Sequence, residues 1–373
     1  MTQKSLGLVM ACTVSVVAAG TLVGARRGPD AQTAPQTMRA VVVADGKPIV
    51  QSVAVPSPGQ GEVRVRVRAA AVNAVDWKPS SRPPATRPDT PPAALDQAAP
   101  PFSQPTTNQS LASQPPGRLE GRNAGNVPGF DAAGVIDRIG DGVTGWTVGD
   151  EVIAFSEARG AYAEFVVVPT TTIVRKPRAL SFEQASGIPT VAFAAYNALF
   201  DVAGVKRGQR VLVHGGAGGV GSAAVQLAKS RGAFVLATAS ERNHAFLKSI
   251  GADQAIDYTV APFESLVSAL DVVLNTVDSD TATRSIVAIK RGGTLVSIAG
   301  QAAPDACEWA GIRCLGRSRG TPVAEVMAET AQLAQDGKYV VYVDAALPLA
   351  RVAEAWAKSQ TGRTRGKIVL TMD

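Results

Sequence analysis

Three regularly spaced glycines are the residues of this chain best suited to bind a phosphate group. Gly216, Gly218 and Gly221 fit the pattern G-x-G-x-x-G, which supplies a tight turn and close backbone approach to a diphosphate. The apolar run 210–213 before them predicts a buried parallel strand, and the apolar spacing over 220–228 predicts a helix. The helix N-terminus would offer N–H groups and a positive dipole end to the phosphates. The expected contacts in this turn are Gly216, Gly218, Gly219, Val220 and Gly221.

The following segment predicts which dinucleotide binds. The run 233–238 predicts a second strand about one βαβ length later, and this context matters because 36 glycines give chance matches. NAD enzymes commonly place an acidic residue at the end of this strand, whereas here it ends at Ser240. Ser240 and Arg242 could bind a 2′-phosphate by hydrogen bond and by charge, which favours NADPH over NADH. Glu241 opposes this assignment, because its carboxylate would repel the phosphate unless it points away.

The composition argues against several other classes of protein. With 373 residues and 46% hydrophobic residues, the chain can form two domains with sizeable cores. Its net charge of +6 is scattered without a basic stripe, so we expect no nucleic-acid partner. Three cysteines are too few for a disulfide framework, and with only His214 and His244 no cluster has zinc-ligand spacing, so we expect no metal site. His214, directly before the glycine turn, is expected to be a structural strand-end residue.

Two segments differ in character from the rest of the chain. Residues 5–25 are uncharged and mostly apolar, which predicts either a cleavable signal or a single membrane anchor. The arginines after this run and the cytoplasmic supply of NADPH favour an anchor with the enzyme domain in the cytoplasm; the alternative is export to the periplasm after cleavage. Residues 79–125 are rich in Pro, Ala, Ser, Thr and Gln, which predicts a disordered insertion.

A small β-rich domain is predicted around this insertion. The stretch 62–69 alternates apolar with charged residues, which is typical of a half-exposed strand in an antiparallel sheet. Short apolar runs separated by glycine turns continue from 127 to 169.

Several segments together resemble the zinc-independent quinone oxidoreductase group (zeta-crystallin-like) of the medium-chain dehydrogenase/reductase superfamily. The resemblance covers nearly everything from Met38 onward except the Pro-rich insertion. Its segments are N-A-V-D-W-K at 73–78, P-G-F-D-A-A-G at 128–134, A-Y-A-E-F at 161–165, A-Y-N-A-L at 195–199, the glycine turn, and G-K-I-V-L at 366–370.

The resemblance implies an α/β fold with two domains, a GroES-like β-rich catalytic domain and a Rossmann domain with a doubly wound parallel sheet. The expected parts are a signal or anchor with linker at 1–37, the catalytic domain at 38–168 with its insertion at 79–125, the Rossmann NADPH-binding domain at 169–312, and a returning C-terminal segment at 313–373. It further implies hydride transfer from NADPH to a quinone or an α,β-unsaturated carbonyl. Zinc-dependent relatives carry a cysteine at the position of Asn73 and a His-Glu pair at 130–131, and this chain lacks that cysteine and histidine.

Hydride transfer leaves an enolate or hydroquinone anion, so the protein must position the acceptor, exclude water and stabilise charge. We expect Asn73 to donate to the acceptor oxygen or the cofactor, Asp76 to organise the same loop, and Lys78 to donate to the developing oxyanion. The structural alternatives are a turn held by Asn73, a helix capped by Asp76 and a solvated Lys78. The remaining expected cofactor contacts are Ser240, Arg242, Tyr258, Asn275, Thr276, Gly300 and Lys367.

Other functions stay open at this point. An enoyl-thioester reductase shares the expected fold. A catalytically silent NADPH-binding, membrane-tethered interaction protein is motivated by the insertion, by Ala74 in place of the family's proline, and by Asp278-Ser279 in place of two glycines. Relatives often dimerise by joining Rossmann sheets edge to edge, so a homodimer is a further expectation.

Overall fold

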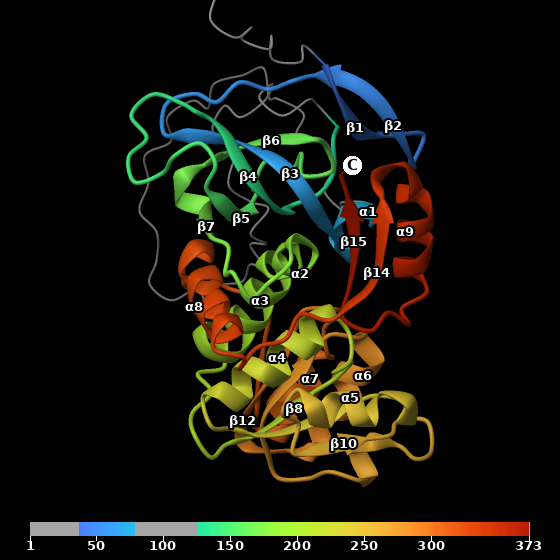
Figure 1. Ribbon diagram of the computed structural model, residues 1–373. Helices are drawn as coiled ribbons and strands as arrows, with labels where there is room; N and C mark the ends of the chain where they lie inside the picture. The colour runs from blue at the N-terminus through green and yellow to red at the C-terminus, as the bar shows by residue number, and fades with distance from the viewer. Residues whose placement is uncertain (1–36, 79–125, 373) are drawn as a thin grey trace, which may run out of the picture. The chain divides into compact units, whose positions relative to one another are not determined.

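The computed structural model describes residues 37–78 and 126–372 (Figure 1). The expected leader, up to residue 36, and the Pro-rich insertion lie outside the described residues. Within the described ranges, no helix combines the length and apolar character needed to span a membrane. The described residues belong to one compact unit that runs from Gln36 to the C-terminus.

A mainly antiparallel sheet is built from both ends of the described chain. Its strand order is β14-β15-β3-β4-β5-β7, and β6 also pairs with β3. Because β15 pairs with β3, the last strand of the chain lies beside one of the first (Figure 1). A separate hairpin consists of β1 (Thr37–Ala44) and β2 (Lys47–Ala54). The strands of the sheet are β3 (Glu62–Val72), β4 (Asp131–Ile139), β5 (Glu151–Phe155), β6 (Phe165–Pro169), β7 (Ile173–Arg175), β14 (Val343–Pro348) and β15 (Lys367–Thr371).

Strand β3 departs from the predicted half-exposed pattern at one position. Arg66 and Arg68 are exposed as expected, but Arg64 is only 5% exposed. The Arg64 guanidinium donates to both carboxylate oxygens of Asp137, at 2.9 and 2.8 Å, and lies 5.0 Å from the ring centroid of Phe165. The pairing of β6 with β3 brings Phe165 to this face, and the half-buried Asp137 supplies the partner that a buried charge requires.

The second sheet is parallel and has six strands in the order β10-β9-β8-β11-β12-β13. In sequence terms this order is 3-2-1-4-5-6, the doubly wound arrangement of dinucleotide-binding domains, so the predicted Rossmann fold is confirmed. Its strands are β8 (Arg210–Val213), β9 (Phe234–Thr238), β10 (Gln254–Ile256), β11 (Leu270–Asn275), β12 (Ile289–Ser297) and β13 (Arg313–Leu315). Its helices are α4 (Gly219–Ser230), α5 (His244–Ser249), α6 (Ser279–Ser285) and α7 (Pro304–Ala310).

Each of the two sheets includes a strand that lies beyond the expected domain boundary. Strand β7, after residue 168, still pairs with β5, and β13, after residue 312, still pairs with β12. The residues over 323–335 have helical periodicity in the sequence and form α8, and the apolar run over 367–371 forms β15. The remaining helices are α1 (Ala74–Trp77), α2 (Phe182–Ser186), α3 (Pro189–Tyr196), α8 (Val323–Gln335) and α9 (Val352–Gln360). Short helical turns are η2 (Thr170–Thr172), η3 (Asn197–Val202), η4 (Glu241–Asn243), η5 (Phe263–Ser265), η6 (Ile286–Ala288) and η7 (Leu349–Arg351).

A disulfide joins two of the three cysteines. It links Cys307 in α7 to Cys314 in β13, the last strand of the parallel sheet. The sequence offered too few cysteines for a framework, and this single bond instead ties one short helix to the strand that follows it.

Candidate active site

The glycine turn after β8 has the local geometry that a diphosphate site requires. A side chain at Gly216 would place its Cβ 2.8 Å from that of Ala237, and one at Gly221 would place it 2.1 Å from the carbonyl oxygen of Gly215. Gly218 is different, because its added Cβ would meet only that same oxygen, at 3.4 Å. The outer glycines are therefore required by packing, whereas the middle one leaves space on the open side of the turn.

Helix α4 begins at this turn and has twelve residues. Its N-cap is Gly218, which has no side chain to cap the first turn, so the orphan N–H groups there are suited to an anion. The turn also lies at the carboxyl end of β8, between strands whose order reverses at β8 and β11, where doubly wound sheets bind their ligands. The residues present therefore fit a dinucleotide.

The residues predicted to bind the 2′-phosphate follow β9 and β10. Ser240 is the N-cap of η4, and its Oγ lies 3.5 Å from Asn243 Nδ2, which donates to it. Arg242 is exposed, and Tyr258 is 56% exposed. Ser240, Arg242 and Tyr258 therefore carry hydroxyl or guanidinium groups that a phosphate could reach.

The predicted residues at the carboxyl ends of β11 and β12 are engaged within the protein. The Asn275 amide nitrogen donates to Asp278 O at 2.8 Å, Ser297 Oγ at 2.7 Å and Ala299 O at 3.1 Å. Thr276 Oγ1 donates to the carbonyl of His214 at 2.8 Å. An added Cβ at Gly300 would meet the Ser279 nitrogen at 2.4 Å. These contacts shape the loops at the carboxyl ends of β11 and β12, so any contact with a cofactor there would come from backbone or from the Thr276 hydroxyl.

The departure Asp278-Ser279 has a structural explanation. Asp278 is the N-cap of α6, and its Oδ1 accepts from the backbone N–H of Thr281 at 2.8 Å.

His214 is buried at the end of β8, and its two ring nitrogens contact hydroxyl groups. Nε2 lies 2.9 Å from Ser285 Oγ, and Nδ1 lies 3.1 Å from Thr238 Oγ1. Because Ser285 Oγ already donates to Thr281 O, it accepts from His214 Nε2, so the neutral tautomer with the proton on Nε2 fits. Burial lowers the pKa of His214 to about 4. The expectation of a structural role agrees with these contacts.

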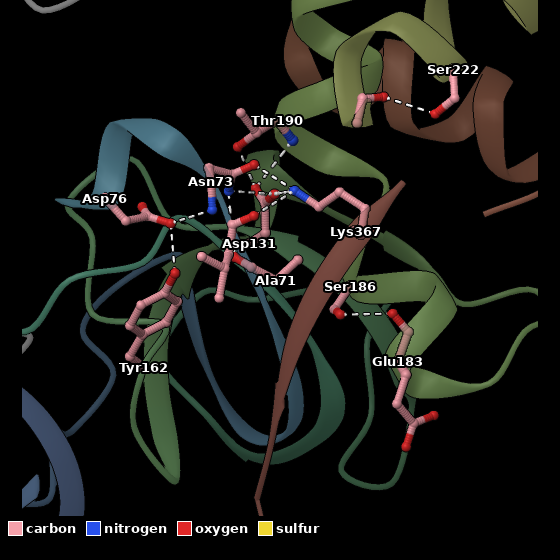
Figure 2. A network of polar contacts seen from close by, with 12 residues as sticks. Ala71, Asn73, Asp76, Asp131, Tyr162, Glu183, Ser186, Thr190, Ser222 and Lys367 are labelled. Atoms are coloured by element: carbon pink, nitrogen blue, oxygen red, sulfur yellow. Dashed lines mark hydrogen bonds and ion pairs between the residues drawn. The ribbon is translucent and has the colours of Figure 1, made fainter. Parts of the chain in front are cut away.

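A second set of polar side chains is buried where β3, β4 and β15 meet (Figure 2). Lys367 Nζ donates to Asn73 Oδ1 at 2.6 Å and to Val72 O at 3.1 Å, and lies 4.0 Å from Asp131 Oδ2. The same Asp131 oxygen accepts from Asn73 Nδ2 at 3.0 Å, and Asp131 Oδ1 accepts from the Thr190 backbone N–H at 3.1 Å. Burial raises the pKa of Asp131 and lowers that of Lys367, while their mutual attraction opposes both shifts.

Asp76 and Lys367 lie on opposite sides of Asn73 in Figure 2. Asp76 Oδ2 accepts from Asn73 N at 2.7 Å and from the Tyr162 hydroxyl at 2.6 Å, whereas its buried Oδ1 has no hydrogen-bond partner. Burial raises the pKa of Asp76 to about 7, although both hydrogen bonds lower it. Asp76 thus holds the start of α1, which combines the two roles that the sequence left open, loop organiser and helix cap.

This network changes the expected roles of two predicted residues. Both amide hydrogens of Asn73 point inward, to Asp131 and to Ala71 O at 3.4 Å, so its side chain positions the segment rather than donating outward. Lys367 is buried with its ammonium in the network, not at the glycine turn, although an added Cβ at Gly219 would lie 3.2 Å from its Cδ. Lys78 is exposed at the C-cap of α1, outside the network.

Asp131, Tyr162 and Thr190 complete the network but were not predicted as site residues. Asp131 and Tyr162 do lie within segments that carried the family resemblance. One signal in the sequence could have pointed to Asp131. It is a carboxylate at the start of a buried strand without a basic neighbour in the sequence, and a buried charge needs a partner from elsewhere in the chain.

A zinc ion does not fit these residues. The position beside Asp131 is taken by the ammonium of Lys367 and the amide of Asn73, which are not zinc ligands. Among the described residues, no three His, Cys, Asp or Glu side chains gather in a way that could hold a metal ion.

Comparisons with known proteins agree with this architecture. Residues 250–370 match the model of the zinc-binding dehydrogenase family, and residues 105–178 match that of the alcohol dehydrogenase GroES-like domain. The chain is 30% identical over 262 residues to the chloroplast envelope quinone oxidoreductase homolog of Arabidopsis thaliana, covering 65% of this chain and 79% of that one. It is 33% identical over 256 residues to the chloroplastic NADPH-dependent alkenal/one oxidoreductase of the same plant, covering 65% of this chain and 63% of that protein's length.

The solved quinone oxidoreductase of Coxiella burnetii has a similar fold. The two structures align with a TM-score of 0.71 and 28% sequence identity, and the alignment covers 90% of this chain and 100% of that one. The chain therefore belongs to the quinone and alkenal oxidoreductases of the medium-chain dehydrogenase/reductase superfamily.

Proposed function

We propose that this chain is an NADPH-dependent reductase that transfers a hydride to a quinone or an α,β-unsaturated carbonyl without zinc. The observation that carries the proposal is the turn at Gly218. The Ala237 side chain crowds Gly216 and the Gly215 carbonyl crowds Gly221, which leaves one open glycine at the start of a twelve-residue helix. The names of its quinone and alkenal oxidoreductase relatives support the acceptor class, and the NADPH dependence of one of them supports the cofactor.

When bound, NADPH would supply the hydride, and the chain would hold its diphosphate at the turn and its 2′-phosphate near Ser240 and Arg242. The protein's own residues fix the segment that faces the acceptor. Lys367 and Asp131 hold Asn73, Asp76 holds the first backbone N–H of the same segment, and α1 carries Lys78 into solvent. In the proposal, the Lys78 ammonium donates to the oxyanion that forms, and solvent supplies the final proton.

The test is a substrate panel with the purified full-length protein. Quinones, enones and enoyl thioesters are each offered with NADPH and with NADH, and the loss of the reduced-nicotinamide absorbance is followed. Turnover of a quinone or enone with NADPH supports the proposal. Tight NADPH binding without turnover of any acceptor would favour the silent binding protein, and turnover of thioesters alone would favour the enoyl-thioester reductase.

We further propose that the chain is membrane-associated through its leader, with the enzyme domain in the cytoplasm, where NADPH is supplied. The disulfide between Cys307 and Cys314 favours the exported alternative, because structural disulfides persist in oxidising compartments. Alkylating free thiols in intact cells before lysis separates the two locations. Labelled Cys307 and Cys314 support the cytoplasmic placement, and protected cysteines at both positions contradict it.

A homodimer is proposed from the edge of the parallel sheet. Strand β13 is the last strand in the described order, so its outer edge is available for pairing with a second copy. Light scattering after gel filtration distinguishes a dimer from a monomer.

A further inference from the structure

Arg365 reaches the segment after β9 from a loop near the C-terminus. Its Nε donates to Asn243 Oδ1 at 2.9 Å, and its Nη2 donates to the carbonyl oxygen of Arg242 at 3.1 Å. These partners lie 122 and 123 residues earlier in the chain, three and two residues after Ser240. The loop before β15 thus delivers a guanidinium to the place where the sequence predicts the 2′-phosphate.

Asn243 connects this guanidinium to the predicted phosphate ligand. Its Oδ1 accepts from Arg365, and its Nδ2 donates to Ser240 Oγ at 3.5 Å. The Ser240 hydroxyl and the Arg365 guanidinium therefore contact the same side-chain amide, one at its nitrogen and the other at its oxygen. In dinucleotide-binding folds, the residue at the position of Ser240 faces the 2′ position of the ribose.

The guanidinium is also held in one orientation. Its central carbon lies 5.5 Å from the ring centroid of Phe246 and 5.5 Å from that of Tyr342, which are 5.3 Å from each other. Aromatic faces favour a flat cation at this distance and limit its rotation. Such preorganisation is what a charge needs in order to bind a ligand at low entropic cost.

The charge of Arg365 is not neutralised within the described ranges. Its two hydrogen-bond acceptors are the side-chain amide oxygen of Asn243 and the backbone carbonyl oxygen of Arg242, and no described carboxylate forms an ion pair with it. Glu241 adjoins Arg242 in the sequence, and Asp257 accepts from the backbone N–H groups of Glu241 and Thr259. A half-buried guanidinium without a carboxylate partner is suited to a phosphate, because its remaining N–H groups can donate to phosphate oxygens.

We propose that Arg365 binds the 2′-phosphate of NADPH and is the residue that sets the preference for NADPH over NADH. The assignment rests on the proposed function, since it requires a dinucleotide on the glycine turn. It would also offset the repulsion between the Glu241 carboxylate and the phosphate, because Arg365 adds a second positive charge beside Arg242 where the phosphate would lie.

The experiment measures binding by calorimetry with NADPH and NADH as probes, in wild type and in variants of the full chain. Arg365→Gln removes the charge but keeps a side chain that can reach Asn243, and Arg365→Lys keeps the charge without the planar fork. Arg363→Gln is the matched control, an exposed arginine two residues away. We expect Arg365→Gln to weaken NADPH binding by roughly 10- to 100-fold, as lost charged hydrogen bonds do, and to leave NADH binding unchanged. Arg365→Lys should lose less, and Arg363→Gln should match wild type.

Two results would overturn the assignment. If Arg365→Gln weakens NADPH and NADH binding equally, Arg365 only ties the C-terminal loop to η4. If the variant keeps the wild-type preference, another residue sets it. A wild-type protein that binds neither dinucleotide would refute the proposed function itself. That failure is seen in the wild type alone, whereas a failure of the Arg365 assignment is seen only in the variants. Thermal unfolding of each variant without cofactor shows whether a loss of binding reflects a loss of fold.

Discussion

Lys367 Nζ lies 2.6 Å from Asn73 Oδ1, although 294 residues separate them in the sequence. The contact exists because β15 pairs antiparallel with β3, where Ile368 faces Val72. It places the positive charge of the last strand next to Asp131, at the base of the segment that carries Lys78. The stability of this segment therefore depends on a residue from the opposite end of the chain.

Removing the Lys367 charge should destabilise the protein strongly. Lys367→Met leaves Asp131 buried without its cation, and breaking a buried ion pair in this way costs about 3–5 kcal/mol. Adding Asp131→Asn to the same chain should recover part of that loss, since both charges are then absent. Urea unfolding of the two single variants and the double variant measures the coupling. Lys338→Met, at an exposed lysine, is the control. Strictly additive losses would contradict the interaction.

Replacing Asp76 by asparagine should change how stability depends on pH. Burial raises the pKa of Asp76 to about 7 from 3.8, so the folded state holds its proton more tightly than the unfolded state. The resulting stabilisation is complete below pH 3.8 and is lost as the pH rises through 7, a change of about 4 kcal/mol over this window. Asp76→Asn keeps an acceptor for Tyr162 but cannot ionise. Its stability relative to wild type should therefore increase between pH 4 and pH 8. A constant difference in unfolding free energy would rule out the shifted pKa.

His214 should make the protein less stable in acid. Burial lowers its pKa to about 4 from 6.5, so the unfolded state binds the proton first as the pH falls. The contribution is fully present above pH 6.5 and is lost progressively down to pH 4, by about 3 kcal/mol. His214→Gln keeps a hydrogen-bonding side chain that does not titrate, so its unfolding free energy should fall less over this range. Parallel curves for the variant and wild type would show that other groups cause the acid sensitivity.

Alanine substitutions at two glycines of the phosphate turn should affect protein stability and NADPH binding differently. Gly221→Ala forces a Cβ against the carbonyl oxygen of Gly215 and should cost about 3 kcal/mol of stability. Gly218→Ala meets that oxygen only at 3.4 Å, so its stability should stay within about 1 kcal/mol of wild type. Its methyl group would nevertheless occupy the open side of the turn, and NADPH binding should weaken by roughly 10-fold or more. Unfolding curves and calorimetry on both variants test this contrast. Tight NADPH binding by Gly218→Ala would argue against a diphosphate at this glycine.

Local sequence patterns predicted the elements of this fold well. The strand before Gly216, the helix after it, and the later segments at 323–335 and 367–371 all appear where periodicity and turn residues indicated, because these signals act over a few neighbouring residues. The same signals missed the burial of Arg64, since only the pairing of β6 with β3 brings Phe165 to it.

The sequence by itself determined a dinucleotide turn, a parallel sheet and a chain without zinc-ligand spacing, because these follow from residue types at short, fixed intervals. Only the tertiary structure decided which side chains share a site. It turned both amide hydrogens of Asn73 inward, buried the ammonium of Lys367 beside Asp131, and brought Arg365 to Asn243. Such contacts depend on the pairing of distant strands and on the cost of burying charges without partners, and no local pattern in the sequence encodes either.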